Sequence, residues 1–312
     1  MTSQQPTTRG VLGTFLNVPF EPMPNDARAV ILGAPFDCGQ HPTRIGCRLG
    51  PQSIRTHSAL VADAMADASF DLVRTLRLVD GGDAAVTPGL IEPSFVAIEN
   101  SVAAILASGA VPVTMGGDGA ITLPQLRAVA RRWPGLTVLH LDAHTDAYPI
   151  RGRGRGQYDN GNTFTHAAEE RIIDVRNSLH VGTRGAIDVD PIVAEARAMG
   201  YEVVPMDELR RRGLDSLLAH LRERLAGRPV YLCWDMDVFD PSAAPGVANP
   251  VWGGLSAAEG LTILRGLAGL DIVAIDVNTV SPPHDPAGMT AFLAGQVMVE
   301  AMAGIARRWL NR

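Results

Sequence analysis

The sequence contains no lysine: all 27 of its basic side chains are arginine. Acidic residues number 33, the formal net charge is −6, and no block of basic residues occurs. Domains that bind nucleic acid usually carry a clustered basic footprint. Nucleic acid is therefore not expected as a partner of this chain.

Cysteine is also scarce, with only Cys38, Cys47 and Cys233 in 312 residues. An odd and widely spaced set argues against a disulfide framework and matches no zinc motif, which favours a reducing compartment. The N-terminal segment MTSQQPTTRG lacks the apolar core of a signal peptide, and no uninterrupted apolar run is long enough to span a bilayer. The sequence predicts a soluble cytoplasmic protein without a membrane partner.

After a Pro- and Asn-rich arm over residues 1–25, the chain alternates short apolar runs with longer amphipathic segments. The expected strands are Ala29–Pro35, Thr75–Asp80, Ala110–Thr114, Leu136–Asp142, Ser178–Gly182, Glu202–Pro205, Pro229–Asp235 and Asp271–Val277. The expected helices are Pro51–Ala66, Pro93–Ala107, Leu123–Arg132, Pro191–Met199, Leu214–Ala226, Ser256–Leu267 and Gly288–Trp309. This alternation predicts a single α/β domain over residues 26–312, with a central parallel sheet of about eight strands and helices on both faces.

Two expected strands end in potential metal ligands at alternate positions. Asp142, His144 and Asp146 follow one strand, and Asp235 and Asp237 end another. Residues two apart in extended chain point to the same face, and sites of open α/β sheets form at the carboxyl ends of strands. A divalent cation would relieve the repulsion between the carboxylates, and Mn²⁺, Ni²⁺, Fe²⁺, Co²⁺ or Zn²⁺ would suit this ligand set. The simpler alternative is that the aspartates cap helices and form turns.

A wider pattern includes both clusters. It consists of PFDCGQHPTRIGCRLGPQSIRTHS (35–58), MGGDGAIT (115–122), HLDAHTD (140–146), WDMDVFDPSAAPG (234–246) and AIDVNTVSPPHD (274–285). These stretches resemble the ureohydrolases, the family of arginase, agmatinase and other guanidino-compound hydrolases. The resemblance covers nearly the whole chain and implies an arginase/deacetylase-like fold.

The resemblance also implies a centre of two Mn²⁺ ions. Asp142 and Asp235 would bridge both ions, and His144 and Asp237 would complete the shell of one. Asp146 would serve the other ion together with the histidine of a GGDH motif. In this chain the motif reads GGDG, so Gly119 replaces that imidazole. The sequence therefore predicts one ion or fewer per chain, with Mn²⁺ or Ni²⁺ as the metal.

Two further positions differ from the family pattern. Asn160 stands where an agmatinase-like histidine assists proton transfer, and an amide cannot titrate near neutral pH. Thr279 stands where a family glutamate pairs with the guanidinium of the substrate, which a carboxylate holds best in bidentate fashion. His166 is a weak substitute for the lost histidine, and we expect it to be a surface residue of a helix.

These departures lead to three hypotheses. In the first, the chain is a weakly active or inactive subunit that assembles with an active paralogue, similar to the impaired subunit of the two-subunit, nickel-dependent metformin hydrolases. In the second, it is an active, agmatinase-like hydrolase of a guanidino compound with an altered, one-metal centre, as in the related deacetylases. In the third, it is a non-catalytic structural or regulatory protein stabilised by a metal.

The oligomer and the substrate loops follow from the same resemblance. The family forms trimers and hexamers, so the chain is expected to assemble with a paralogue or with itself. The loops around Gln40–Ile45 and Ile150–Asn162 are expected to set the choice among small guanidino-type substrates.

Overall fold

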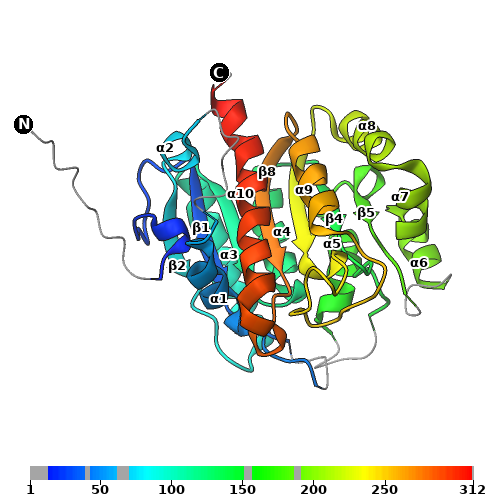
Figure 1. Ribbon diagram of the computed structural model, residues 1–312, viewed down its shortest axis with the longest axis horizontal. Helices are drawn as coiled ribbons and strands as arrows, with labels where there is room; N and C mark the ends of the chain where they lie inside the picture. Colours follow the sequence, from blue (N-terminus) through cyan, green and yellow to red (C-terminus); the bar gives the residue numbers. More distant parts are fainter. Residues whose placement is uncertain (1–12, 39–42, 62–69, 151–156, 186–190, 311–312) are drawn as a thin grey trace, which may run out of the picture.

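The computed structural model describes residues 13–38, 43–61, 70–150, 157–185 and 191–310. Eight parallel strands form one sheet in the order β2-β1-β3-β8-β7-β4-β5-β6 (Figure 1). Their bounds are β1 Ala29–Ala34, β2 Val79–Asp83, β3 Val111–Gly116, β4 Thr137–Leu141, β5 Leu179–Val181, β6 Glu202–Val204, β7 Pro229–Asp235 and β8 Asp271–Asn278. The prediction of an α/β fold with an eight-stranded parallel sheet is confirmed.

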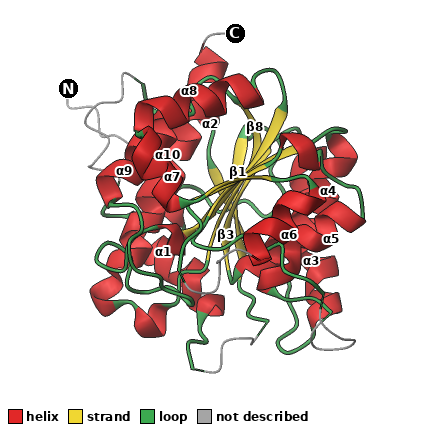
Figure 2. Ribbon diagram, turned by 90° about the vertical axis from the view of Figure 1, so that its right-hand side faces the viewer, coloured by secondary structure: helices red, strands yellow, loops and turns green. Residues whose placement is uncertain are grey.

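Helices cover both faces of the sheet, which Figure 2 shows nearly edge-on. One face carries α1 Gly50–Ser58, α7 Met206–Arg212, α8 Leu214–Leu225, α9 Ala257–Gly266 and α10 Met289–Leu310. The other face carries α3 Ile91–Ala107, α4 Thr122–Arg132, α5 Thr163–Glu169 and α6 Pro191–Met199. The short helix α2, Leu72–Leu76, precedes β2.

The strands separate two hydrophobic cores, because successive side chains of a strand point to opposite faces. In β7, Leu232 and Trp234 belong to the core under α8–α10, whereas Tyr231 and Cys233 belong to the core under α3–α6. All four side chains are buried. Burial on both faces explains why this strand reads as a nearly continuous apolar run.

Helix α10 crosses the first face beside α1 and α9 (Figure 1). The segment Pro286–Leu310 is long and apolar enough to cross a membrane by length and composition, with a mean hydropathy of 1.4 over its best window. The segment is not an uninterrupted apolar run, because it contains Glu300, Arg307 and Arg308. In the fold, 61% of that window is buried, and residues such as Val297 and Met298 are fully enclosed in the core. Helix α10 therefore packs as a core helix.

Two predicted elements need correction. The strand expected at Thr75–Asp80 begins only at Val79, because Asp71 caps α2 by accepting a hydrogen bond from the backbone N–H of Arg74, and α2 includes Thr75. The helix expected at Pro51–Ala66 ends at Ser58, and residues 62–69 lie outside the described part. Helices α2 and α7 were not predicted, and α5 was expected only as a helix that carries His166, without bounds. The other predicted elements agree with the structure to within about two residues.

The described end of the N-terminal arm is attached to the sheet. Phe15 is fully buried, and its backbone N–H donates to the carboxylate of Asp80 at 2.9 Å. The backbone N–H of Leu16 donates to the Ser58 hydroxyl at 2.8 Å. The proposed domain boundary at residue 25 stays a prediction.

Candidate metal centre

The register of β4 and β7 brings the two predicted ligand clusters together. The strands are neighbours and parallel, and Leu141 pairs with Trp234. The residues that follow, Asp142 and Asp235, therefore lie side by side at the carboxyl edge of the sheet. Such edges are where open α/β sheets place their sites.

The first group of ligand atoms is contributed by Asp142, His144 and Asp237, all buried. His144 Nδ1 lies 3.1 Å from Asp142 Oδ1 and 3.1 Å from Asp237 Oδ2. Backbone donors fix both carboxylates, since the His144 N–H donates to Asp142 Oδ1 at 2.6 Å and the Ala143 N–H donates to Asp237 Oδ1 at 3.0 Å. Three of the five predicted ligands thus converge without any rearrangement.

A second group consists of His140, Asp142 and Asp146, which are also buried and whose ligand atoms lie within 4.8 Å of one another. His140 Nε2 is 3.0 Å from Asp142 Oδ2. This carboxylate oxygen is nevertheless buried and accepts no hydrogen bond from the described residues. A buried, unsatisfied carboxylate oxygen is costly, and a cation beside it would remove that cost.

The electrostatics of the cluster also fit a cation. Burial and the neighbouring Asp237 raise the pKa of Asp235, and burial together with Asp142 raises the pKa of Asp237 to about 6. Burial opposes ionisation of Asp142 as well, but the adjacent His140 and His144 hold its pKa well below its usual range. Carboxylates with an imidazole suit a divalent transition metal. The residues present therefore fit the divalent ion that the resemblance implies.

Asp235 lies beside these groups but belongs to neither set of mutually close ligand atoms. Its Oδ1 accepts from the Asp237 N–H at 2.7 Å, and its Oδ2 accepts a short hydrogen bond from the Thr279 hydroxyl. Thr279 is buried and has a φ of 71°, which is a strained conformation for a β-branched residue. The threonine side chain thus contacts a predicted ligand at the end of β8, and bridging by Asp235 stays a prediction.

Gly119 and Asn160 lie together next to Asp146. A Cβ at Gly119 would sit 3.0 Å from Asp146 Oδ2 and 3.5 Å from the Cβ of Asn160. The Asn160 side-chain oxygen accepts a weak hydrogen bond from the Cys38 thiol at 3.7 Å. Gly119, which replaces the histidine of the GGDH motif, and Asn160 therefore both lie on the Asp146 side of the centre.

His166 differs from its expected position. It is 7% exposed, so it is buried and not a surface residue. Its Nε2 lies 2.5 Å from the Gln157 carbonyl, and its ring packs on Tyr158 with 4.7 Å between centroids. The His166 imidazole therefore contacts Gln157 and Tyr158 and belongs to neither group of ligand atoms. Residues 39–42 and 151–156 of the two predicted substrate loops lie outside the described part.

Sequence reasoning missed His140 and His180. These residues pair across β4 and β5, and their Nδ1 atoms are 2.9 Å apart. A signal for His140 was present, because it lies two residues before Asp142 in a strand and so shares its face. The contact with His180 depends on the pairing of two strands that lie far apart in the sequence.

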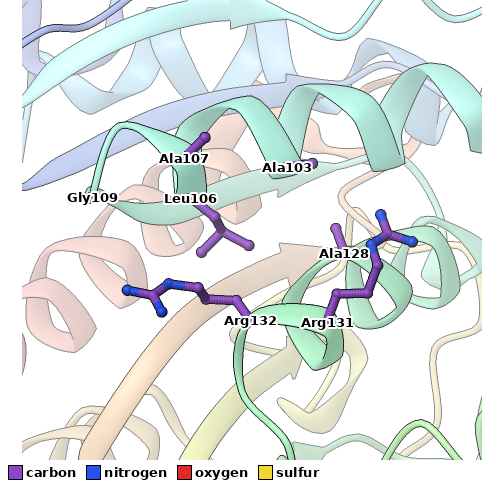
Figure 3. Close-up of a pocket in the computed structure, with 7 residues that line it drawn as sticks. All are labelled: Ala103, Leu106, Ala107, Gly109, Ala128, Arg131 and Arg132. Carbon is purple, nitrogen blue, oxygen red and sulfur yellow. The ribbon is translucent and has the colours of Figure 1, made fainter.

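A surface hollow of about 410 Å³ lies between α3 and α4 (Figure 3). Leu106, Arg131 and Arg132 are among its lining residues, and none of the predicted site residues is. It adjoins the last turns of two helices that lead into β3 and β4, and hence the amino edge of the sheet. The hollow is therefore separate from the candidate centre.

Comparisons with known proteins agree with this geometry. The model of the arginase family matches residues 27–304. The proclavaminate amidinohydrolase of Streptomyces clavuligerus is 36% identical over 297 residues, covering 94% of this chain and 93% of that protein. A solved structure of proclavaminate amidinohydrolase from that organism superposes with a TM-score of 0.90 at 35% identity and covers 96% of this chain and 98% of that chain.

Two further relatives are named for other activities. An agmatinase of Photorhabdus laumondii is 36% identical over 292 residues, covering 92% of this chain and 91% of that protein. A formiminoglutamase variant of Trypanosoma cruzi, solved with Mn²⁺, is 25% identical with a TM-score of 0.78. That comparison covers 90% of this chain and 94% of that chain.

Proposed function

We propose that this chain, which belongs to the arginase family, is a metal-dependent hydrolase that cleaves a C–N bond of a small guanidino compound. The observation that carries the proposal is the buried convergence of Asp142, His144 and Asp237 at the carboxyl edge of the sheet. Relatives at 36% identity over almost the whole chain include an amidinohydrolase and an agmatinase.

In this proposal Asp142, His144 and Asp237 hold one divalent ion, Mn²⁺ or Ni²⁺, with Asp235 as a further ligand. When bound, such an ion activates water for attack on an electrophilic carbon. The chain itself fixes the ligands through backbone hydrogen bonds to their carboxylates and excludes bulk water by burying them. Loss of urea or a substituted urea would complete the reaction.

The substrate is expected to be held differently from a simple alkylguanidinium. The carboxylate that the resemblance assigns to the guanidinium is replaced by Thr279, whose hydroxyl is already bonded to Asp235. A neutral side chain cannot supply the charge-assisted, bidentate contact of a carboxylate. We propose that groups other than the residue at position 279 orient the guanidino carbon. We also propose that the enzyme is cytoplasmic.

The test uses the full chain, purified alone and loaded separately with Mn²⁺ and Ni²⁺. Urea release is measured on a panel of guanidino acids, guanidino amines and biguanides, together with bound metal per chain. We expect urea release from at least one class, and loss of activity together with the ion held by Asp142, His144 and Asp237 in Asp237→Asn. A matched control is Asp240→Asn, because Asp240 lies three residues after Asp237 and outside the ligand groups. A chain that binds metal and releases no urea from any compound would contradict catalysis by the isolated protein.

A second candidate function is favoured by three substitutions around one centre. Gly119 lacks the imidazole, Asn160 cannot titrate, and Thr279 lacks the carboxylate. We propose as the alternative that this chain is a weakly active subunit that assembles with an active, GGDH-bearing paralogue, while a homomeric trimer or hexamer would accompany the main proposal.

Native mass spectrometry of the tagged chain from its own host separates the two. A homo-oligomer that retains hydrolase activity supports the main proposal. A mixed oligomer whose activity disappears when the paralogue is removed supports the subunit role. A monomer with neither partner nor metal contradicts both.

A further inference from the structure

We propose that His140 supplies the nitrogen ligand that Gly119 cannot, and completes a second metal site with Asp142 and Asp146. This inference rests on the proposed metal centre, because Asp142 is shared between the two sites. It changes the expected content of the chain from one ion to two. The second metal site can then be filled although the GGDH imidazole is absent.

The spacing of the donor atoms carries the proposal. His140 Nε2 lies 3.0 Å from Asp142 Oδ2, yet this oxygen accepts no hydrogen bond within the described residues. Two ligands that bind one ion at about 2.1 Å and subtend about 90° lie about 3.0 Å apart. The contact therefore has the separation of neighbouring ligands on one ion. The first site shows a matching distance, 3.1 Å, from His144 Nδ1 to each of its two carboxylates.

The other nitrogen of His140 is held in a way that suits a ligand. His140 Nδ1 faces His180 Nδ1 at 2.9 Å. A metal-binding histidine usually donates its second N–H to a neighbouring acceptor, which fixes the ring and its tautomer. Donation from His140 Nδ1 to His180 leaves the lone pair of His140 Nε2 available at the centre.

Donation from His140 requires one particular tautomer of His180, and the surroundings of His180 accommodate that tautomer. With Nδ1 as acceptor, His180 carries its proton on Nε2, which is buried and has no hydrogen-bond partner among the described residues. The imidazole contacts two aromatic rings edge-on, Tyr201 at 4.6 Å and Phe164 at 5.0 Å between centroids. An N–H directed at an aromatic face is a weak but real interaction. The aromatic rings thus surround the second imidazole without competing for its acceptor nitrogen.

The lack of a side chain at Gly119 leaves room beside the Asp146 carboxylate. A Cβ there would lie 3.0 Å from Asp146 Oδ2, so the Asp146 carboxylate would have to shift by a few tenths of an ångström to admit a side chain at this position. Without it, Asp146 shares one compact group with His140 and Asp142. The two candidate nitrogen ligands come from different elements, His140 from β4 and position 119 from the turn before α4. One can therefore replace the other without a change in the sheet.

A different role for His140 is to orient Asp142 by donating a hydrogen bond. The metal count separates the two roles. The full chain is loaded with Mn²⁺, freed of excess metal by gel filtration, and analysed for metal per chain by inductively coupled plasma mass spectrometry. We expect two ions in the natural protein, one in His140→Gln, and two again in His140→Gln/Gly119→His. The matched control is His140→Gln/Gly119→Ala, which adds the Cβ without the imidazole and is expected to hold one.

A spectroscopic measurement on the unaltered chain covers the case in which His140→Gln does not fold. The protein is labelled with ¹⁵N-histidine and loaded with Zn²⁺, and the histidine nitrogens are followed by NMR. Two metal-bound histidines, His140 through Nε2 and His144, are expected. Metal-shifted resonances from His144 alone would overturn the inference.

The outcomes distinguish this inference from the proposed function. One ion per natural chain, unchanged by His140→Gln, overturns the His140 ligand and leaves the His144 site intact. Two ions in both proteins also overturn it. No ion in the natural chain, under loading that fills a known family member, contradicts the proposed metal centre itself.

Discussion

The change Asp80→Asn should destabilise the protein by breaking a buried ion pair. Asp80 is 1% exposed and Arg55 is 6% exposed as side chains. Arg55 Nε donates to Asp80 Oδ2 at 2.8 Å, and its Nη2 donates to Oδ1 at 2.9 Å. The same carboxylate accepts from the backbone N–H of Phe15 and of Gly82, each at 2.9 Å. Four donors therefore converge on two oxygens, and an amide offers only one oxygen to them.

The expected loss of unfolding free energy depends on the burial of the pair and on the contacts that Arg55 keeps in the variant. Removing one partner of a buried pair costs about 3–5 kcal/mol, because the other charge is left uncompensated. Arg55 keeps a contact to Asp83 Oδ1 at 2.6 Å, but that carboxylate is 43% exposed and screened by water. We therefore expect a loss near the lower end, about 3 kcal/mol. At about 2 °C per kcal/mol for a domain of this length, the Tm should fall by roughly 6 °C.

The assay is equilibrium unfolding in urea with thermal melts, with Asp83→Asn as the matched control on the same arginine. The control should cost less than about 1 kcal/mol, because its carboxylate is exposed. Because Asp80 also holds Phe15, Asp80→Asn should accelerate amide exchange at that residue while Asp83→Asn should not. Equal losses in the two variants would refute the reasoning that burial decides the cost.

Three further outcomes are expected. Burial raises the pKa of Asp118 to about 6, so the folded state binds its proton more tightly than the unfolded state. Stability of the metal-free protein should therefore fall as pH rises from about 4 to about 6, by about 2–3 kcal/mol from this group, and urea titrations should show that part of the slope missing in Asp118→Asn. Mn²⁺ at about 100 times its Kd should add about 2.7 kcal/mol, and chelation should reverse the gain in a thermal melt. Thr279→Val should cost the metal-free protein about 1–3 kcal/mol, because it leaves the buried Asp235 Oδ2 without its hydroxyl donor, whereas Thr279→Ser should retain most of the stability.

Most of the sheet could be predicted because burial on both faces makes each strand a short apolar run. The prediction for β7 matches its bounds of Pro229–Asp235. The strand expected at Thr75–Asp80 was wrong for a local reason, since an aspartate cap at Asp71 and a left-handed residue at Arg77, with φ 45°, fit a short helix into the same apolar stretch. Apolar periodicity alone does not separate a short buried helix from a strand.

The site could be predicted only in part. The alternation of Asp142, His144 and Asp146 is local information, and so is Asp235 with Asp237. Which atoms of these residues approach one another depends on the register of β4 with β7, which no local pattern contains. The pairing of His140 with His180 is non-local for the same reason.

The two interpretations of the aspartates, as turn formers or as metal ligands, are compatible because each carboxylate has two oxygens. Asp142 and Asp235 each use Oδ1 to accept the backbone N–H two residues later, at 2.6 and 2.7 Å. That bond is local turn chemistry and needs no metal. The Oδ2 atom of Asp142 is thereby held toward the interior of the centre, where no described donor satisfies it. The same bond that makes the turn thus positions the ligand, so a ligand-bearing turn can persist when a neighbouring ligand, such as the one missing at Gly119, has been lost.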